Sequence, residues 1–144
     1  MIRVFVDASV LYAACYSETG SARELLLESV RGHLILVVSP HVLEEVERNP
    51  VAKAHQALPA FETLIKLVDP EKVRKPTLEE LEQAAAYTAL KDAPIVAAAV
   101  AANVDYLVTW DRKHLINPPK VAERSGLRIL TPGELMDSLR EEPQ

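Results

Sequence analysis

Short β-branched runs alternate along this chain with longer amphipathic segments, and this alternation constrains the fold more than any other feature. Four runs have the length and apolar content of buried strands, namely residues 2–6, 34–38, 106–109 and 127–130. Strands that alternate with helices form a mostly parallel sheet that is covered on both faces. We therefore expect an α/β protein, a single-domain three-layer sandwich around a mostly parallel central sheet.

Three of the helical segments have clear signals. Residues 21–30 place apolar side chains on one side and Arg and Glu on the other, which is typical of a helix that packs on a sheet. Residues 77–89 begin with Thr77 and, three positions later, Glu80, which is the spacing of a capping box. A third, strongly apolar helix is expected over residues 95–102.

Prolines divide the middle of the chain. Pro50 and Pro59 interrupt a helical region over residues 40–67, so we expect two or three helices there. Pro70 and Pro76 bracket a charged stretch, which we interpret as a loop with room for an edge strand.

Length and composition are those of one globular domain, because the chain has 144 residues, of which 49% are hydrophobic and 26% charged. We expect this domain over residues 1–139 and a frayed tail over 140–144. The apolar runs are shorter than the roughly 20 residues of a membrane-spanning helix, and the N-terminal segment lacks the pattern of a secretion signal. A cytoplasmic location, with no membrane contact, is therefore expected. The single cysteine, Cys15, is expected to be a small buried thiol.

Two acidic residues follow predicted strands. Asp7 comes directly after the first strand, and Asp111 lies just beyond the third. In open α/β sheets, ligands bind beyond the carboxyl ends of the strands, so these two side chains are candidates for one shared crevice. The alternative for Asp7 is that it only caps the following helix, since Asp is favoured at that position.

Two further acids lie at helix positions. Asp92 precedes Pro94 and the apolar helix, where an acid is favoured by the helix dipole, so a capping role alone would explain it. Glu45 borders the apolar face of the helix that follows the second strand, whereas Glu44 points further toward solvent. Glu45 is therefore the candidate, and Glu44 remains the alternative if the helix is rotated.

Carboxylates gathered at one sheet edge repel one another unless a cation neutralises them, so the set predicts a metal. Oxygen ligands favour Mg²⁺ or Mn²⁺, which can activate water against a phosphodiester. The net charge of −5 weighs weakly against tight nucleic-acid binding, but it is compatible with a transient substrate reached through the metal. Arg112 and His114 lie near the predicted pocket and are candidates to contact substrate phosphate.

Several segments resemble, in order and spacing, the blocks of the PIN-domain family; they are residues 6–9, 39–46, 91–99, 106–115 and 127–135. The resemblance spans nearly the whole chain. It implies a flavodoxin-like strand order and metal-dependent RNA cleavage. It also implies an acidic pocket that holds Mg²⁺ or Mn²⁺ and catalyses the reaction, formed by Asp7, Glu45, Asp92 and Asp111, with Ser9 and Thr109 as hydroxyls that hold the carboxylates or a water.

Many prokaryotic members of that family are VapC-like toxins, which pair with a small antitoxin and commonly form homodimers. The function predicted from the resemblance is therefore an endoribonuclease, the toxin of a type II toxin-antitoxin pair. A PIN-like binding or scaffolding module with an unused pocket is the alternative, and a receiver-like phosphoryl-transfer protein is disfavoured because no suitable Lys follows a late strand. The RNA target, the number of metal ions and the oligomeric state stay open.

Overall fold

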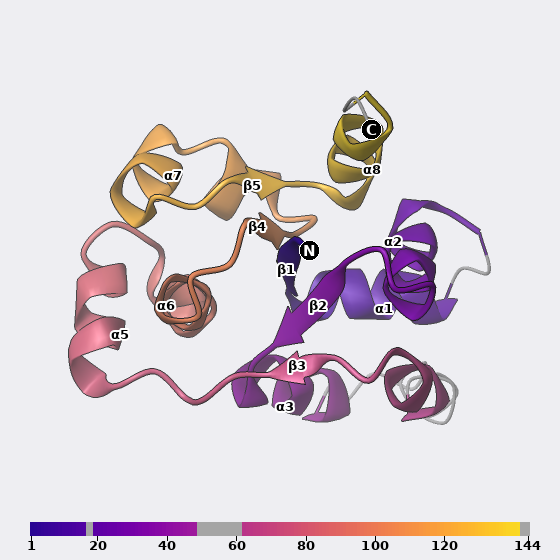
Figure 1. Ribbon diagram of the computed structural model, residues 1–144. Helices are drawn as coiled ribbons and strands as arrows, with labels where there is room; N and C mark the ends of the chain where they lie inside the picture. The colour runs from indigo at the N-terminus through magenta and orange to yellow at the C-terminus, as the bar shows by residue number, and fades with distance from the viewer. Residues whose placement is uncertain (17–18, 49–61, 142–144) are drawn as a thin grey trace.

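A computed structural model describes residues 1–16, 19–48 and 62–141 of the chain (Figure 1). Its strands are β1 (Arg3–Val6), β2 (Ile35–Val38), β3 (Glu71–Lys72), β4 (Tyr106–Val108) and β5 (Ile129–Leu130). The helices are α1 (Ala8–Tyr16), α2 (Ser21–Val30), α3 (Pro40–Arg48), α5 (Leu78–Ala85), α6 (Ala93–Ala101), α7 (Pro119–Ser125) and α8 (Pro132–Glu141). A 3₁₀ turn, η1 (Leu90–Asp92), and a π-helical turn, η2 (Arg112–Ile116), follow α5 and β4, and residues 62–68 are also helical.

The strands form one parallel sheet in the order β3-β2-β1-β4-β5. The predicted α/β class is therefore confirmed. The four strands expected from the sequence lie in the order 2-1-3-4, as in a flavodoxin-like sheet. The short edge strand β3, which lies outside β2, makes the full order 3-2-1-4-5 instead of the flavodoxin order 2-1-3-4-5.

Helices cover the two faces of this sheet (Figure 1). α1, α2 and α8 lie on one side and pack on one another in the pairs α1 with α2 and α2 with α8. α5, α6 and α7 lie on the other side, where α5 packs on α6. The result is the expected three-layer sandwich.

The centre of the sheet forms the core. Val4, Phe5 and Val6 of β1 are fully buried, as are Leu107 and Val108 of β4. Strands covered on both faces need apolar side chains at successive positions, which explains why these runs do not alternate with polar residues.

The topological switch point of the sheet, where the strand order reverses, lies between β1 and β4. The chain leaves β1 toward β2 on one side, whereas it leaves β4 toward β5 on the other. Val6 of β1 pairs with Val108 of β4, so the residues that follow these two strands emerge side by side. Such a switch point is where open α/β sheets bind ligands.

Several boundaries differ from the sequence-based expectations. α5 ends at Ala85 instead of residue 89, because Tyr87 turns into the core, where it is 8% exposed. Cys15 is half-buried, so the expectation of a fully buried thiol was wrong. α8 continues to Glu141, and the rest of the tail, like Pro50 and Pro59, lies outside the described residues. None of the helices in the described ranges is long and apolar enough to cross a membrane.

Candidate functional site

Two hydroxyl groups join the carboxyl ends of β1 and β4 through Asp7, which is 5% exposed. Ser9 Oγ donates a hydrogen bond to Asp7 Oδ1 at 2.5 Å, and Thr109 Oγ1 donates one to Asp7 Oδ2. The same hydroxyls accept backbone N–H groups, Ser9 from Trp110 at 3.2 Å and Thr109 from Asp111 at 3.0 Å. Through these two hydroxyl groups, the Asp7 carboxylate is linked to the backbone N–H groups of Trp110 and Asp111.

Asp7 also caps α1, since its Oδ1 accepts the N–H of Val10 at 3.3 Å. The capping role expected as an alternative is thus present, but the carboxylate has two further donors that a cap does not require. Burial raises the pKa of Asp7, and the charge of Glu45 raises it further, against the hydrogen bonds from Ser9, Thr109 and Val10, which lower it.

Asp92 has a different environment. It occupies the N-cap position of α6, yet its side chain makes no capping hydrogen bond. Among the residues that the structure describes, its Oδ2 is the one buried side-chain polar atom without a hydrogen-bond partner. Buried polar atoms almost always have partners, so the capping role does not account for this residue, and an unpaired carboxylate oxygen fits a missing cation.

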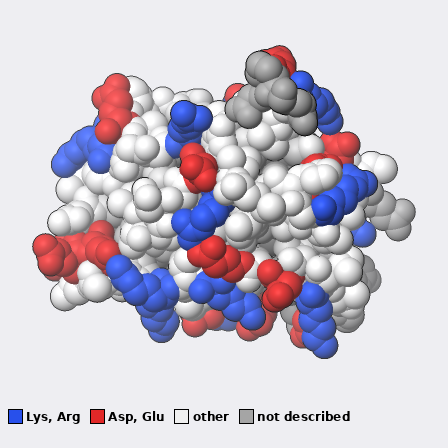
Figure 2. All heavy atoms as spheres, in the orientation of Figure 1, with Lys and Arg blue, Asp and Glu red and all other residues white. Residues whose placement is uncertain are grey.

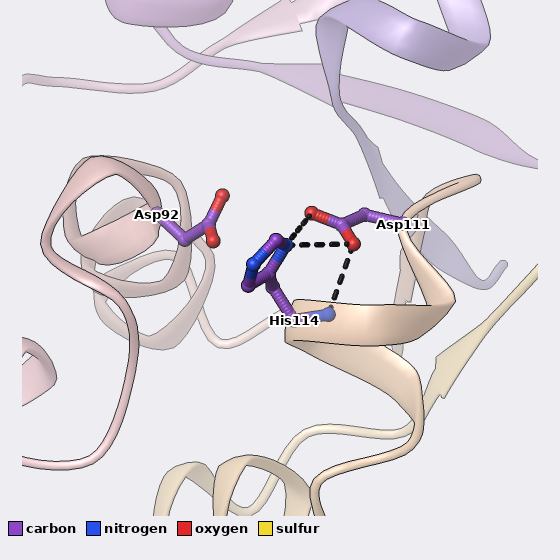
Figure 3. A group of neighbouring side chains, drawn as sticks. All are labelled: Asp92, Asp111 and His114. Atoms are coloured by element: carbon purple, nitrogen blue, oxygen red, sulfur yellow. Dashed lines mark hydrogen bonds and ion pairs between the residues drawn. The ribbon is translucent and has the colours of Figure 1, made fainter.

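Asp111 and His114 meet Asp92 across a small space (Figure 3). Asp111 caps η2, where its Oδ1 accepts the His114 N–H at 2.9 Å, and both of its oxygens lie 3.2 Å from His114 Nδ1. The ligand atoms of Asp92, Asp111 and His114 all lie within 4.8 Å of one another. Figure 3 shows the imidazole between the two carboxylates, so η1, the turn that follows β4, and η2 converge here.

Lys91, which the sequence reasoning missed, lies at the same place. Its Nζ is 3.4 Å from Asp92 Oδ2 and 3.4 Å from Asp111 Oδ2. The contact with Asp92 is an ion pair, and Asp92 Oδ2 accepts no hydrogen bond from the described residues. Burial acts to raise the pKa of Asp111, but the His114 N–H and the Lys91 ammonium outweigh it and hold the pKa below its usual value. The only signal in the sequence was a Lys directly before a candidate acid.

Glu45 lies at the border of the site. Its side chain is 39% exposed and pairs with His41 at 2.5 Å, and its charge acts on Asp7. Glu44 is more exposed and pairs with Arg48 at 3.6 Å on the solvent side of α3. Of the two glutamates, Glu45 is therefore the one on the side of Asp7, although its ligand atoms lie outside the group formed by Asp92, Asp111 and His114.

Arg112 is exposed at the start of η2, where its Nη1 lies 3.8 Å from Glu134 Oε1. Such an exposed, long ion pair is weak, so the guanidinium can change partners at little cost. Lys113 is exposed beside it.

The residues present fit a divalent cation. Asp92 and Asp111 supply two carboxylates, one of which has an unpaired oxygen, and His114 adds a nitrogen. His114 lies beside the predicted ligands Asp92 and Asp111, whereas the sequence-based expectation named oxygen ligands alone. Three protein ligands leave positions for water or substrate, as a reactive metal site needs.

Comparisons with solved structures found proteins of similar fold. PAE2754 from Pyrobaculum aerophilum, with a TM-score of 0.60 and 18% identity, is similar over 97% of this chain and 91% of its own. VapBC2 from Rickettsia felis, solved bound to a DNA fragment from its promoter, has a TM-score of 0.64 and 16% identity over 89% of this chain and 97% of its own. No curated protein sequence matches.

Both likenesses concern the fold, because the identities are low. At the level of sequence, the family model described as PIN domain matches residues 3–113, which include β1, β4 and the acids Asp7, Glu45, Asp92 and Asp111. This chain belongs to the PIN-domain family.

Proposed function

We propose that this protein is a metal-dependent endoribonuclease. PIN domains are generally nucleases, and the observation that carries the proposal for this chain is the Asp92 carboxylate. It is 5% exposed and makes no capping bond, and its Oδ2 accepts no hydrogen bond from the described residues, although the Lys91 ammonium lies 3.4 Å from it. An acid in that state is unfavourable for stability alone, which supports a role in binding a cation.

Each residue has a distinct role in this proposal. Asp92 and Asp111 hold Mg²⁺ or Mn²⁺, with His114 or Glu45 completing the ligands. When bound, the ion lowers the pKa of a water and stabilises negative charge on the phosphodiester. Asp7, held by Ser9 and Thr109, orients that water through its remaining acceptor position.

His114 and Arg112 act on the substrate side. Because Asp111 engages His114 Nδ1, the other ring nitrogen, Nε2, is the atom available to substrate or metal. Arg112, whose guanidinium pairs with Glu134 at 3.8 Å, can bind a phosphate.

The distribution of charged side chains supports a substrate that contacts the protein only near the acidic site. The chain carries a net charge of −5, and on the face drawn in Figure 2 basic side chains are interspersed with acidic ones. A mixed surface gives little long-range attraction for a polyanion. RNA is then recognised by the few cations near the acids.

The physiological role that we propose is that of a toxin in a type II toxin-antitoxin pair, acting in the cytoplasm. It rests on the PIN domain and on the structural likeness to VapBC2. The partners would be an RNA substrate, a small antitoxin that covers the pocket, and a second copy of this chain.

A second candidate is a binding module whose acidic pocket holds no metal. The observation in its favour is Lys91, whose ammonium lies between Asp92 and Asp111 and neutralises part of their charge. A chain that used this lysine in place of a metal would not need a cation for stability.

Mn²⁺ titration calorimetry separates the two functions. Asp92→Asn and Asp111→Asn should each weaken Mn²⁺ binding at least tenfold, because each removes a charged ligand. Glu44→Gln is the matched control, since it removes an acid on the solvent side of α3 and should leave binding unchanged. The same proteins are then mixed with a pool of RNAs. Wild type and the control should cleave with Mn²⁺, whereas a folded wild type that binds no Mn²⁺ and cleaves no RNA would rule out the nuclease.

A further inference from the structure

Trp110, the single tryptophan of the chain, differs from the other described aromatic residues in how its ring is exposed. Its side chain is 42% accessible at the end of β4. The other exposed aromatic ring in the described part of the chain, Tyr16, stacks on Tyr12 with 6.1 Å between the ring centroids. Tyr87 and Tyr106 are buried and have an arginine over the ring. Trp110 is thus the exposed aromatic side chain with no ring or cation packed against it in the described structure.

The backbone of Trp110 is held firmly at the acidic site. Its N–H donates to Ser9 Oγ at 3.2 Å, and that hydroxyl in turn donates to Asp7. Its carbonyl accepts the N–H of Arg112 at 3.0 Å. Its chain neighbours are Thr109, which bonds Asp7, and Asp111, which belongs to the candidate metal ligands. A large apolar ring on such a fixed backbone loses little conformational entropy when it binds something.

The residues that follow Trp110 carry positive charge. Arg112 and Lys113 are both exposed on η2, and the Lys91 ammonium lies 3.4 Å from Asp111 Oδ2. A flat ring beside cations has the two components of a single-stranded nucleic-acid site, in which bases stack on aromatic side chains and basic groups follow the phosphates.

We propose that Trp110 is a stacking platform for one unpaired base of the RNA, next to the phosphodiester that lies at Asp92 and Asp111. This inference rests on the proposed nuclease function and specifies its substrate as RNA that is single-stranded at the cleaved position. Stacking needs no base-specific hydrogen bond, so Trp110 selects for unpaired structure instead of for sequence.

A protein partner is the less favoured occupant. Aromatic anchors in protein interfaces fill pockets at the centre of an apolar patch, with charged residues depleted around them. Trp110 instead directly precedes Asp111 of the acidic site and the two exposed cations Arg112 and Lys113, and no neighbouring exposed apolar side chain extends it into a patch along β4 or η2.

The test uses the fluorescence of Trp110 itself, since no other tryptophan contributes. Wild-type protein with Mn²⁺ is titrated with a short single-stranded RNA whose phosphorothioate linkages resist cleavage. We expect the emission to be quenched as RNA binds, and we expect no quenching by an abasic oligomer with the same backbone. A hairpin whose bases are all paired should quench much less.

Affinity gives the second readout. Trp110→Ala should weaken RNA binding, measured by anisotropy of labelled RNA, by roughly 5- to 150-fold, which corresponds to 1–3 kcal/mol per stacked base. Trp110→Phe keeps a ring and should recover most of the affinity. Leu78→Ala, which removes an exposed apolar side chain on α5, is the matched control and should bind as wild type does. Mn²⁺ binding by each variant shows whether the acidic site is intact.

The outcomes separate this inference from the function on which it rests. If wild type binds and cleaves RNA but the emission does not change, or if Trp110→Phe is as weak as Trp110→Ala, the stacking role is wrong and the nuclease stands. If RNA neither binds nor is cleaved, both are wrong. Quenching by the abasic oligomer would also overturn the inference, because it would show that the backbone alone perturbs the ring.

Discussion

Asp7 and Asp92 are equally buried, each at 5% exposure, but they have opposite surroundings. Asp7 accepts hydrogen bonds from Ser9, Thr109 and Val10. Asp92 leaves Oδ2 unpaired. Position in the sequence does not separate them, because both precede a helix. The difference has measurable consequences for stability and for metal binding.

We predict that Asp7→Asn lowers the free energy of unfolding by about 1–3 kcal/mol, since an amide nitrogen would face a hydroxyl donor and leave it unpaired. Asp92→Asn should leave stability without metal equal to that of wild type or raise it, because it removes a buried charge. Urea denaturation in EDTA measures both. A larger loss for Asp92→Asn than for Asp7→Asn would contradict the assignment of Asp92 to metal binding.

Lys91 competes with a cation for the same oxygens, since its Nζ is 3.4 Å from both Asp92 and Asp111. We predict that Lys91→Met raises the affinity for Mn²⁺ about tenfold, because a unit charge at this distance corresponds to one to a few kcal/mol near a protein surface. Titration calorimetry is the measurement. Lys113→Met removes the same charge from a more distant exposed position and should change the affinity much less. Equal effects of the two substitutions would mean that only net charge matters.

At the scale of elements, the N-terminus of α5 is stabilised by hydrogen bonds that depend on the ionisation of a glutamate. Thr77 and Glu80 form a capping box, and Arg74 donates two hydrogen bonds to the Glu80 carboxylate. The bonds from Arg74, with that of the Thr77 N–H, lower the pKa of Glu80 from 4.5 to about 2. A carboxyl group with a lowered folded-state pKa contributes stability above pH 4.5, which is lost as the pH falls toward 2.

We therefore predict that Glu80→Gln unfolds more readily than wild type at neutral pH, and that the difference shrinks as the pH falls from 4.5 toward 2. Glutamine keeps the capping-box geometry and loses the charge. Thermal unfolding followed across this pH range is the measurement. Glu79→Gln on the same turn, for which the described residues show no ion pair, should follow wild type throughout. A difference that does not depend on pH would show that Arg74 does not act on an ionised Glu80.

The elements were predictable where one local pattern decides the structure. α2 has the predicted bounds because its apolar stripe faces the sheet, and the start of α5 follows from Thr77 and Glu80. The end of α5 was not predictable, since Ala86 favours helix and the turn depends on the burial of Tyr87 against distant residues. The strand β3 falls between Pro70 and Pro76, where the sequence left room for an edge strand, but its two exposed residues carry no pattern of their own that fixes its bounds.

The site was predictable in part for a related reason. Residues at strand ends meet because the sheet is parallel, so Asp7 and Asp111 could be grouped from the sequence. Which carboxylate is unpaired depends on side-chain contacts across the fold. The contacts of Lys91 and His114 with Asp92 therefore became evident only from the three-dimensional structure.

At the scale of the whole molecule, the sheet offers little for strand-to-strand assembly. Its edges are β3, with exposed Glu71 and Lys72, and β5, which has two residues. Short, charged edges disfavour pairing with another chain. Contacts between copies must then use helices, and the exposed apolar side chains Val30 and Leu67 are the candidates between residues 21 and 67.

We predict that the protein is a dimer by light scattering at high concentration and that Leu67→Glu shifts it to a monomer, because Leu67 is 61% exposed and a charge there would oppose burial. Leu78→Glu, on an exposed position outside this region, is the control and should remain dimeric. A wild-type protein that is monomeric at all concentrations would show that this face does not form a dimer interface.

The register between β1 and β4 has a consequence for the newly made chain. Asp7 is synthesised well before its partner Thr109, which lies 102 residues later in the chain, and before the acid Asp111. A slip of one residue in the pairing of Val6 with Val108 would turn Thr109 to the opposite face of the sheet. A nascent chain that has not yet reached Thr109, or a misregistered copy, therefore lacks the assembled acidic centre, and any cleavage activity requires β1 and β4 to be paired in this register.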